Sequence, residues 1–212
     1  MLQYFIMYIV VGLGNPGEEY KDTRHNTGRI ILEKIASDFD FSDWKVDKKF
    51  NYLLSEGKIG KEKVKFVMPE TFMNKSGASV APLVTSAKKA EQLIVVYDDL
   101  DLPVGKMKIS FNRSSGGHKG VESIIRTLKT EAFVRIRVGI SPKTPTGKIK
   151  KPTGDAVVGD FILGKFKDAE MTEIKKVAET AGSALEVLVA GGSSSKAVRL
   201  ARERAMGEFN GN

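Results

Sequence analysis

Two short apolar runs limit what this chain can fold into. Residues 6–11 (IMYIVV) and 93–100 (LIVVYDDL) are rich in β-branched side chains, and the first run is closed by Gly12. Runs of this length and composition predict strands buried on both faces, as in the sheet of an α/β protein. The second run ends in carboxylates, so we expect chemistry at that end of the sheet.

Segments with other periodicities fill the rest of the chain. Residues 26–39 show one apolar and one polar face, and Asn26 or Thr27 is expected to cap that helix. Residues 51–59 and 63–68 flank a GKE turn and predict a hairpin. Further strands are expected at 106–111 and 134–140, and further helices at 76–87, 118–129, 168–190 and 193–209. The pattern predicts a single three-layer α/β domain, in which helices flank a mixed, twisted sheet.

Composition restricts the kinds of site that the chain can form. The chain has 212 residues, of which 41% are hydrophobic and 28% charged, and this fits one globular domain over residues 1–212. It has no cysteine, which excludes thiolate sites and fits a reducing compartment such as the cytoplasm. His25 and His118 are the two histidines, too few for most transition-metal sites, so we expect no metal and no cofactor. No run approaches the roughly 20 apolar residues of a membrane span.

Two basic stretches favour a polyanionic partner. The formal net charge is +8, and residues 102–121 and 132–154 carry several cations without any acidic residue. A solvated surface would explain either stretch alone, but the two flank a glycine-rich loop, which favours a nucleic-acid phosphate backbone. Residues 141–154, rich in Pro, Gly and Lys, are the best candidate for a mobile basic loop.

Two patterns match nucleotide-binding motifs only superficially. GLGNPG (12–17) fits the dinucleotide pattern GxGxxG, but Pro16 and the polar residues that follow oppose the helix that this motif requires. GDFILGKF (159–166) fits GxxxxGK, but Phe166 stands where the magnesium-binding hydroxyl must be. No GxSxG pattern occurs, which weakens a serine-hydrolase interpretation.

Polar side chains gather in loops instead. The loop at 12–26 contains Asn15, Tyr20, Arg24, His25 and Asn26. Three later segments place polar or aromatic residues at a strand end or a helix start: 69–77 with Phe72, Met73 and Asn74; 97–105 with Asp98, Asp99 and Asp101; and 114–120 with His118. Each alone has a simple structural explanation as a helix boundary or a cap. The carboxylates are also compatible with a magnesium site, and the glycine-rich loop with a phosphate or carboxylate group.

In this order, the segments resemble the bacterial peptidyl-tRNA hydrolase family across nearly the whole chain. The resemblance rests on GLGNPG, TRHN, TFMN followed by SG, DDLDLPVG, GGHKG, VRIRVGI and GDFILGKF. It implies an enzyme that hydrolyses the ester between a peptide, or an N-blocked aminoacyl group, and the 3′ end of tRNA, and so recycles prematurely released peptidyl-tRNA. It also implies a cytoplasmic monomer. The family usually begins just before the first strand, so residues 1–6 are expected to be an N-terminal extension.

The resemblance implies catalytic roles for three residues. His25 matches the general base that takes a proton from water, and Asp98 matches the carboxylate that orients that histidine. Asn15 matches the amide that helps to distinguish blocked from unblocked aminoacyl groups. No nucleophilic side chain is needed, because an ester is more reactive than an amide.

The resemblance and the basic stretches also give candidate substrate-binding or tRNA-binding residues. These are Tyr20, Asn26, Phe72, Met73, Asn74, His118, Lys119 and Arg137. Asn74 matches the residue that binds near the tetrahedral centre, where an amide donates to the developing oxyanion. Tyr20 and Phe72 match positions at the tRNA end, where stacking on an unpaired base is expected. Lys119 replaces an asparagine that is common in the family, which exchanges an amide contact for a charge.

Two other classes of function are also considered. A non-catalytic tRNA- or RNA-binding module would use the same basic surface. A magnesium-dependent phosphoesterase would use Asp98, Asp99 and Asp101, and its activity would be lost in EDTA.

Overall fold

One mixed sheet forms the centre of the molecule, for which a computed structural model describes residues 7–144, 146, 148–191 and 195–210. Within these residues, seven strands lie in the order β2-β3-β4-β1-β5-β7-β6. They are β1 (Met7–Gly12), β2 (Lys45–Asp47), β3 (Tyr52–Ile59), β4 (Glu62–Pro69), β5 (Leu93–Pro103), β6 (Met107–Phe111) and β7 (Val134–Ser141). β4, β1, β5 and β7 are parallel, whereas β2, β3 and β6 pair antiparallel at the two sides.

The second apolar run forms a central strand because its side chains fill cores on both faces of the sheet. Along β5, Ile94 and Val96 point into one core cluster, whereas Leu93 and Val95 point into the other. All four side chains are at most 1% exposed. This alternation is the period of two that a strand imposes, and here both faces are covered.

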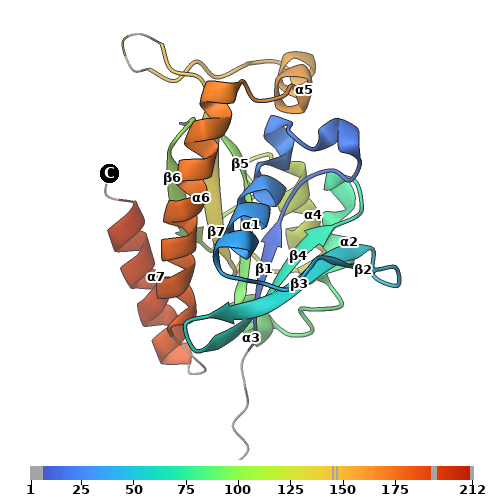
Figure 1. The fold of residues 1–212 in the computed structure, drawn as a ribbon, viewed down its shortest axis with the longest axis vertical. Helices are drawn as coiled ribbons and strands as arrows, with labels where there is room; N and C mark the ends of the chain where they lie inside the picture. Colours follow the sequence, from blue (N-terminus) through green and yellow to red (C-terminus); the bar gives the residue numbers. More distant parts are fainter. Residues whose placement is uncertain (1–6, 145, 147, 192–194, 211–212) are drawn as a thin grey trace, which may run out of the picture.

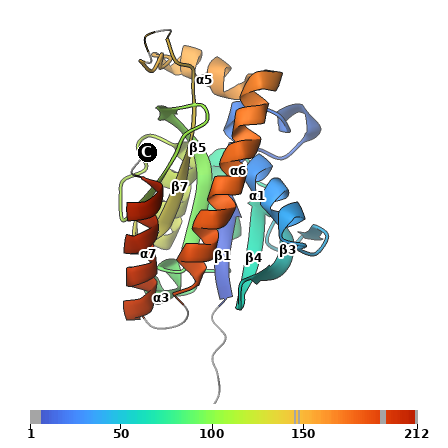
Figure 2. The ribbon, with the colours of Figure 1, turned by 60° about the vertical axis from the view of Figure 1, so that its left-hand side comes forward.

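Helices cover both faces and give three layers (Figures 1 and 2). α1 (Thr27–Asp38) and α6 (Asp168–Val189) pack together on one face, and α7 (Ser195–Phe209) packs beside α6 and against β6. α2 (Ser76–Val80) and α4 (Lys119–Leu128) pack together on the other face. The predicted three-layer α/β domain with a mixed sheet is confirmed.

Three local predictions need correction. The helix expected over 76–87 divides into α2 and α3 (Ala87–Ala90), because Pro82 cannot continue a helix that begins at Ser76. No side chain caps α1, although Asn26 stands at its N-cap position. β2 and α5 (Asp155–Leu163) were not predicted. The proposed extension at 1–6 lies outside the described residues.

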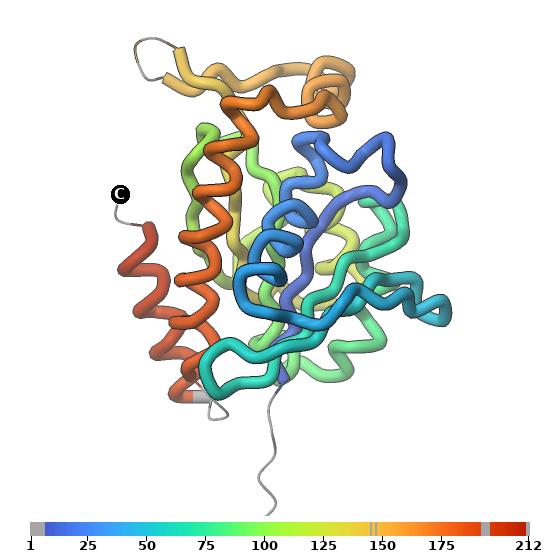
Figure 3. Tube along the Cα trace, in the orientation of Figure 1, coloured from blue at the N-terminus to red at the C-terminus, as the bar shows by residue number. Residues whose placement is uncertain are grey.

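Helix α5 lies beyond the carboxyl ends of the parallel strands, apart from the two helical layers (Figure 1). The chain that leaves β7 crosses this end of the molecule before it reaches α5 (Figure 3). This crossing segment includes most of the predicted basic loop at 141–154, whose mobility stays a prediction. Among the described helices, none is both long and apolar enough to cross a membrane.

Candidate active site

A cleft of about 900 Å³ opens where β5 and the loop after β1 end. It collects residues from all four polar segments of the sequence. Nine of the predicted site residues line it: Asn15, His25, Phe72, Met73, Asn74, Asp98, His118, Lys119 and Arg137. Tyr20 and Asn26 do not line the cleft. These loops meet because the parallel strands bring their carboxyl ends to one edge of the sheet.

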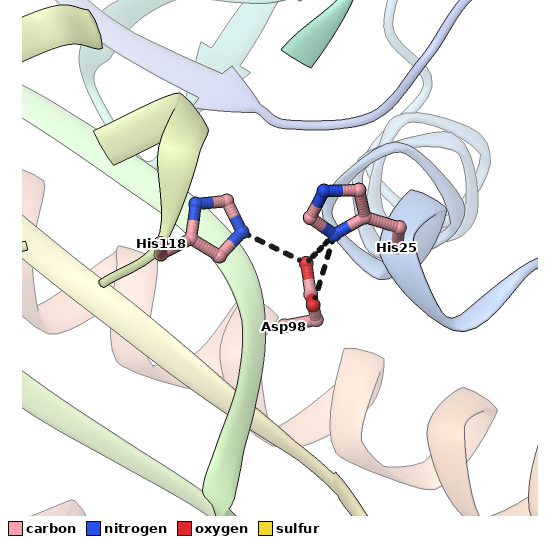
Figure 4. A group of neighbouring side chains, drawn as sticks. All are labelled: His25, Asp98 and His118. Carbon is pink, nitrogen blue, oxygen red and sulfur yellow. Dashed lines mark hydrogen bonds and ion pairs between the residues drawn. The ribbon is translucent and has the colours of Figure 1, made fainter. Parts of the chain in front are cut away.

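A histidine and a carboxylate form the centre of the cleft. His25 lies in η2 (Arg24–Asn26), the 3₁₀ turn directly before α1, and Asp98 lies on β5. His25 Nδ1 is 3.1 Å from each carboxylate oxygen of Asp98. An ionised carboxylate only accepts hydrogen bonds, so Nδ1 carries the proton and Nε2 keeps its lone pair. Figure 4 shows Nε2 directed away from Asp98.

The second histidine is held by the same carboxylate. His118 is the N-cap of α4, and its Nδ1 accepts hydrogen bonds from the backbone N–H of Gly120 at 3.2 Å and of Val121 at 3.3 Å. Nδ1 therefore has no proton, and Nε2–H donates to Oδ1 of Asp98 at 3.0 Å (Figure 4). The backbone of α4 thus fixes the tautomer of His118.

These contacts determine the charge of Asp98. Burial alone raises the pKa of this carboxyl, which is 4% exposed. The attraction of His25 and then of His118, together with their hydrogen bonds, outweighs burial and holds the pKa of Asp98 well below its usual range. Asp98 is therefore an anion that accepts hydrogen bonds from both imidazole rings.

His25, Asp98 and His118 offer the ligand types that transition metals take, with their facing atoms within 4.8 Å of one another. The tautomer of His118 opposes such a site, because a metal-binding nitrogen must be free of its proton. The other carboxylates of this strand do not join the group. Asp99 pairs with Arg137 at 2.6 Å, and Asp101 with Lys151 at 2.6 Å. The described residues therefore fit a hydrogen-bonded cluster better than a metal centre.

Asparagine side chains brace the floor of the cleft. Asn26 accepts a hydrogen bond from the backbone N–H of Asn15 at 2.8 Å and donates to the Asn15 carbonyl at 2.9 Å. Oδ1 of Asn15 accepts from the backbone N–H of Met73 at 2.9 Å. The Asn15 amide is thereby oriented with its oxygen on the protein, which leaves its NH₂ group as the donor available to a ligand.

The walls of the cleft differ in character. One carries the cations Lys108, Arg113, Lys119, Arg137 and Lys151. Another is apolar and comes from Val158 and Ile162 of α5 and from Phe72, which is 57% exposed. The lining of the cleft thus combines cationic and apolar side chains with the polar centre.

Comparison with known proteins identifies the family. The family model described as peptidyl-tRNA hydrolase matches residues 9–207. The chain belongs to the peptidyl-tRNA hydrolase family. A peptidyl-tRNA hydrolase of Thermoanaerobacter sp. is 38% identical over 206 residues, which cover 97% of this chain and 100% of that protein. One of Pediococcus pentosaceus is 40% identical over 181 residues, covering 85% of this chain and 91% of that protein.

A solved structure agrees with this assignment. Peptidyl-tRNA hydrolase from Acinetobacter baumannii superposes with a TM-score of 0.81 at 29% sequence identity, and the match covers 97% of this chain and 95% of that chain. Membership of the peptidyl-tRNA hydrolase family makes the chain an enzyme, a hydrolase. The resemblance inferred from the motifs and the predicted enzyme class are both confirmed.

Two predicted residues have positions that the sequence did not indicate. Tyr20 meets the edge of Phe72, with ring centroids 6.5 Å apart. The Asn26 side chain is hydrogen-bonded to the backbone of Asn15 and does not reach the cleft lining. The sequence did not indicate the burial of Arg135, which is 1% exposed although it lies in a basic stretch. Arg135 and Arg137 are two positions apart on a strand, but this spacing gives no signal of burial, because both faces of the sheet are covered.

Proposed function

We propose that this peptidyl-tRNA hydrolase cleaves the ester between a peptide, or an N-blocked aminoacyl group, and the 3′ end of tRNA, and so returns tRNA from prematurely released peptidyl-tRNA. The names of the relatives support this substrate. The observation that carries the mechanism is the His25–Asp98 pair, placed in a cleft that amide donors and cations also line. We further propose that the enzyme acts as a monomer in the cytoplasm.

His25 is the general base of this reaction. Its Nε2 takes a proton from water while the water oxygen attacks the ester carbonyl carbon. Asp98 holds the ring through Nδ1 and stabilises the imidazolium that forms. The tetrahedral intermediate then collapses: the bond to the ribose oxygen breaks, and that oxygen receives the proton from Nε2. The products are a tRNA with a free 3′-terminal ribose and a peptide carboxylic acid, which releases its proton to solvent and becomes a carboxylate.

Amide groups stabilise the charge that develops on the carbonyl oxygen. Asn74 and Asn15 both line the cleft, and the Asn15 amide is oriented by Met73. A single donor of this kind contributes about 3 to 4 kcal/mol to the transition state in other hydrolases. Asn15 has the further role of sensing whether the amino group of the substrate is blocked.

The cationic wall binds the tRNA. Lys119 and Arg137 contact phosphates, and Tyr20, Phe72 and Met73 contact the unpaired 3′ end. His118 contributes as the second donor to Asp98, and Asn26 by holding Asn15 in place. We propose that the described part of residues 141–154 is a mobile basic loop, of which Lys151 lines the cleft.

The test is release of tRNA from N-acetylaminoacyl-tRNA, in EDTA and without nucleotide. We expect release by the wild-type protein and none by His25→Ala or His25→Asn. The asparagine variant is the sharper one, because its amide still donates to Asp98 but no base remains. Both variants should still bind tRNA. Full activity in either variant would overturn the mechanism. A wild-type protein that binds N-acetylaminoacyl-tRNA but does not hydrolyse its ester would be a non-catalytic binding module.

A further inference from the structure

The residue before His25 lies buried underneath α5. Arg24 is 8% exposed, and its guanidinium lies over the rings of Phe161 and Phe166, with Cζ 4.5 Å and 5.5 Å from the two centroids. Nη1 donates to the carbonyl of Phe161 at 3.4 Å, the carbonyl of a residue in α5. A Cβ at Gly164 would come within 3.0 Å of Nη1, so this glycine leaves room for the guanidinium.

The other end of the guanidinium binds α6. Nη2 pairs with Oε2 of Glu170 at 2.8 Å, and side-chain exposure is 10% for Arg24 and 20% for Glu170. The same oxygen accepts the backbone N–H of Lys167 at 2.9 Å and so caps α6. The side chain of Glu170 is therefore oriented by the N-terminus of its own helix, independently of its contact with Arg24.

The main chain adds a short antiparallel pairing at the same place. The Arg24 N–H donates to the carbonyl of Gly164 at 3.1 Å, and the Phe166 N–H donates to the carbonyl of Asp22 at 3.0 Å. By contrast, α5 itself has no fully buried side chain, with Phe161 and Ile162 only partly buried, and it packs chiefly against η2. The position of α5 over the cleft thus depends on the turn that carries His25.

We infer that Arg24 and Glu170 form a latch that sets the position of α5 and the orientation of His25 together. Arg24 is a positioning residue, since its guanidinium lies among Phe161, Phe166 and Glu170 and it is not part of the cleft lining. When the latch is loosened, α5 and the apolar side chains that it contributes to the cleft shift. The imidazole of His25 shifts at the same time. The catalytic part of this inference rests on the proposed function.

The first test compares kcat and KM of Arg24→Lys and Glu170→Gln with those of the same substitutions in a second, partly buried arginine–glutamate pair. Lysine keeps the charge but cannot bind Glu170 and Phe161 together, because it lacks the planar fork of arginine. The controls are Arg29→Lys and Glu70→Gln: Arg29 also binds a glutamate, at 2.7 Å, and a backbone carbonyl, at 2.8 Å, but not α5. We expect kcat to fall and KM to rise in both latch variants, with a loss of about ten- to hundred-fold in kcat/KM.

Two further readouts separate positioning from simple stability. Hydrogen exchange of the amides of α5, measured without substrate, should quicken by about ten-fold in Arg24→Lys, while α1 and the strands keep their protection. In Arg24→Ala, millimolar guanidinium should restore part of kcat by filling the site between the two rings. It should restore nothing in Arg29→Ala.

Several outcomes would overturn the latch. Wild-type kcat/KM in Arg24→Lys and Glu170→Gln would do so, as would equal losses in the Arg29 and Glu70 controls or unchanged exchange in α5. If the wild-type protein released no tRNA, the proposed function would fall, but the exchange of α5 would still decide whether the latch exists.

Discussion

Replacing Asp98 by asparagine tests the charge relation at the centre of the cleft. In Asp98→Asn the amide remains close in shape, but the anion that faces His25 Nδ1 at 3.1 Å is lost. Unit charges at that distance attract by about 5 kcal/mol at an effective dielectric constant of about 20. Because this attraction stabilises the imidazolium in the transition state, its loss lowers kcat by about 10³- to 10⁴-fold.

The assay is single-turnover release of tRNA from N-acetylaminoacyl-tRNA with enzyme in excess, so that binding and the chemical step are measured separately. The affinity for tRNA should stay within about three-fold of wild type, since Asp98 is buried and lies on the polar centre rather than the cationic wall. Asp38→Asn serves as the control, because it removes the same charge from an exposed pair with Lys34 on α1. A loss of less than ten-fold in Asp98→Asn, or an equal loss in Asp38→Asn, would refute the electrostatic argument.

Three further predictions follow from the charges and the packing. Lys119→Asn should weaken tRNA binding and reduce the slope of log affinity against log salt by about 1, as measured by salt titration; an unchanged slope would remove Lys119 from the phosphate contacts. Asp98 has a lowered pKa in the folded state, so its contribution to stability is full above about pH 4 to 5 and is lost as the pH falls toward the folded pKa. Below about pH 5, the free energy of unfolding in urea should therefore fall less in Asp98→Asn than in wild type, and parallel plots of this free energy against pH would contradict the argument. Gly28→Ala should cost about 3 kcal/mol in urea unfolding, because its Cβ would lie 2.3 Å from the Val96 carbonyl oxygen, whereas Gly207→Ala in α7 meets nothing and should be neutral or stabilising.

Periodicity explains why most of the fold could be predicted. The continuous apolar run of β5 and the apolar face of α4 are local patterns, and the structure buries both as the sequence predicts. Helix α5 could not be found in this way, since none of its side chains is fully buried and only Phe161 and Ile162 are partly packed against the core. The helix expected over 76–87 is interrupted, and Pro82 is a visible signal of this interruption. The apolar residues around Pro82 nevertheless favoured a continuous helix.

The site was only partly accessible from the sequence. His25 and Asp98 are 73 positions apart, and their meeting follows from two parallel strands that end at one edge. The tautomer of His118 depends on two backbone N–H groups of α4, which no residue pattern reveals. Arg24 gives a similarly weak signal, because its partners Phe161 and Glu170 lie more than 130 positions further along the chain, in two different helices.

The two histidines bind one carboxylate but are not equivalent, and this difference gives the proposed proton transfer its direction. A proton on Nδ1 of His118 would face the N–H groups of Gly120 and Val121, so that nitrogen is reserved as an acceptor. Nε2 of His25 has no such restriction and is directed away from Asp98 (Figure 4). In the proposed mechanism, a proton taken from water therefore stays on His25, where Asp98 stabilises it, until the ribose oxygen leaves. His118 acts throughout as a fixed donor that keeps Asp98 ionised and in place.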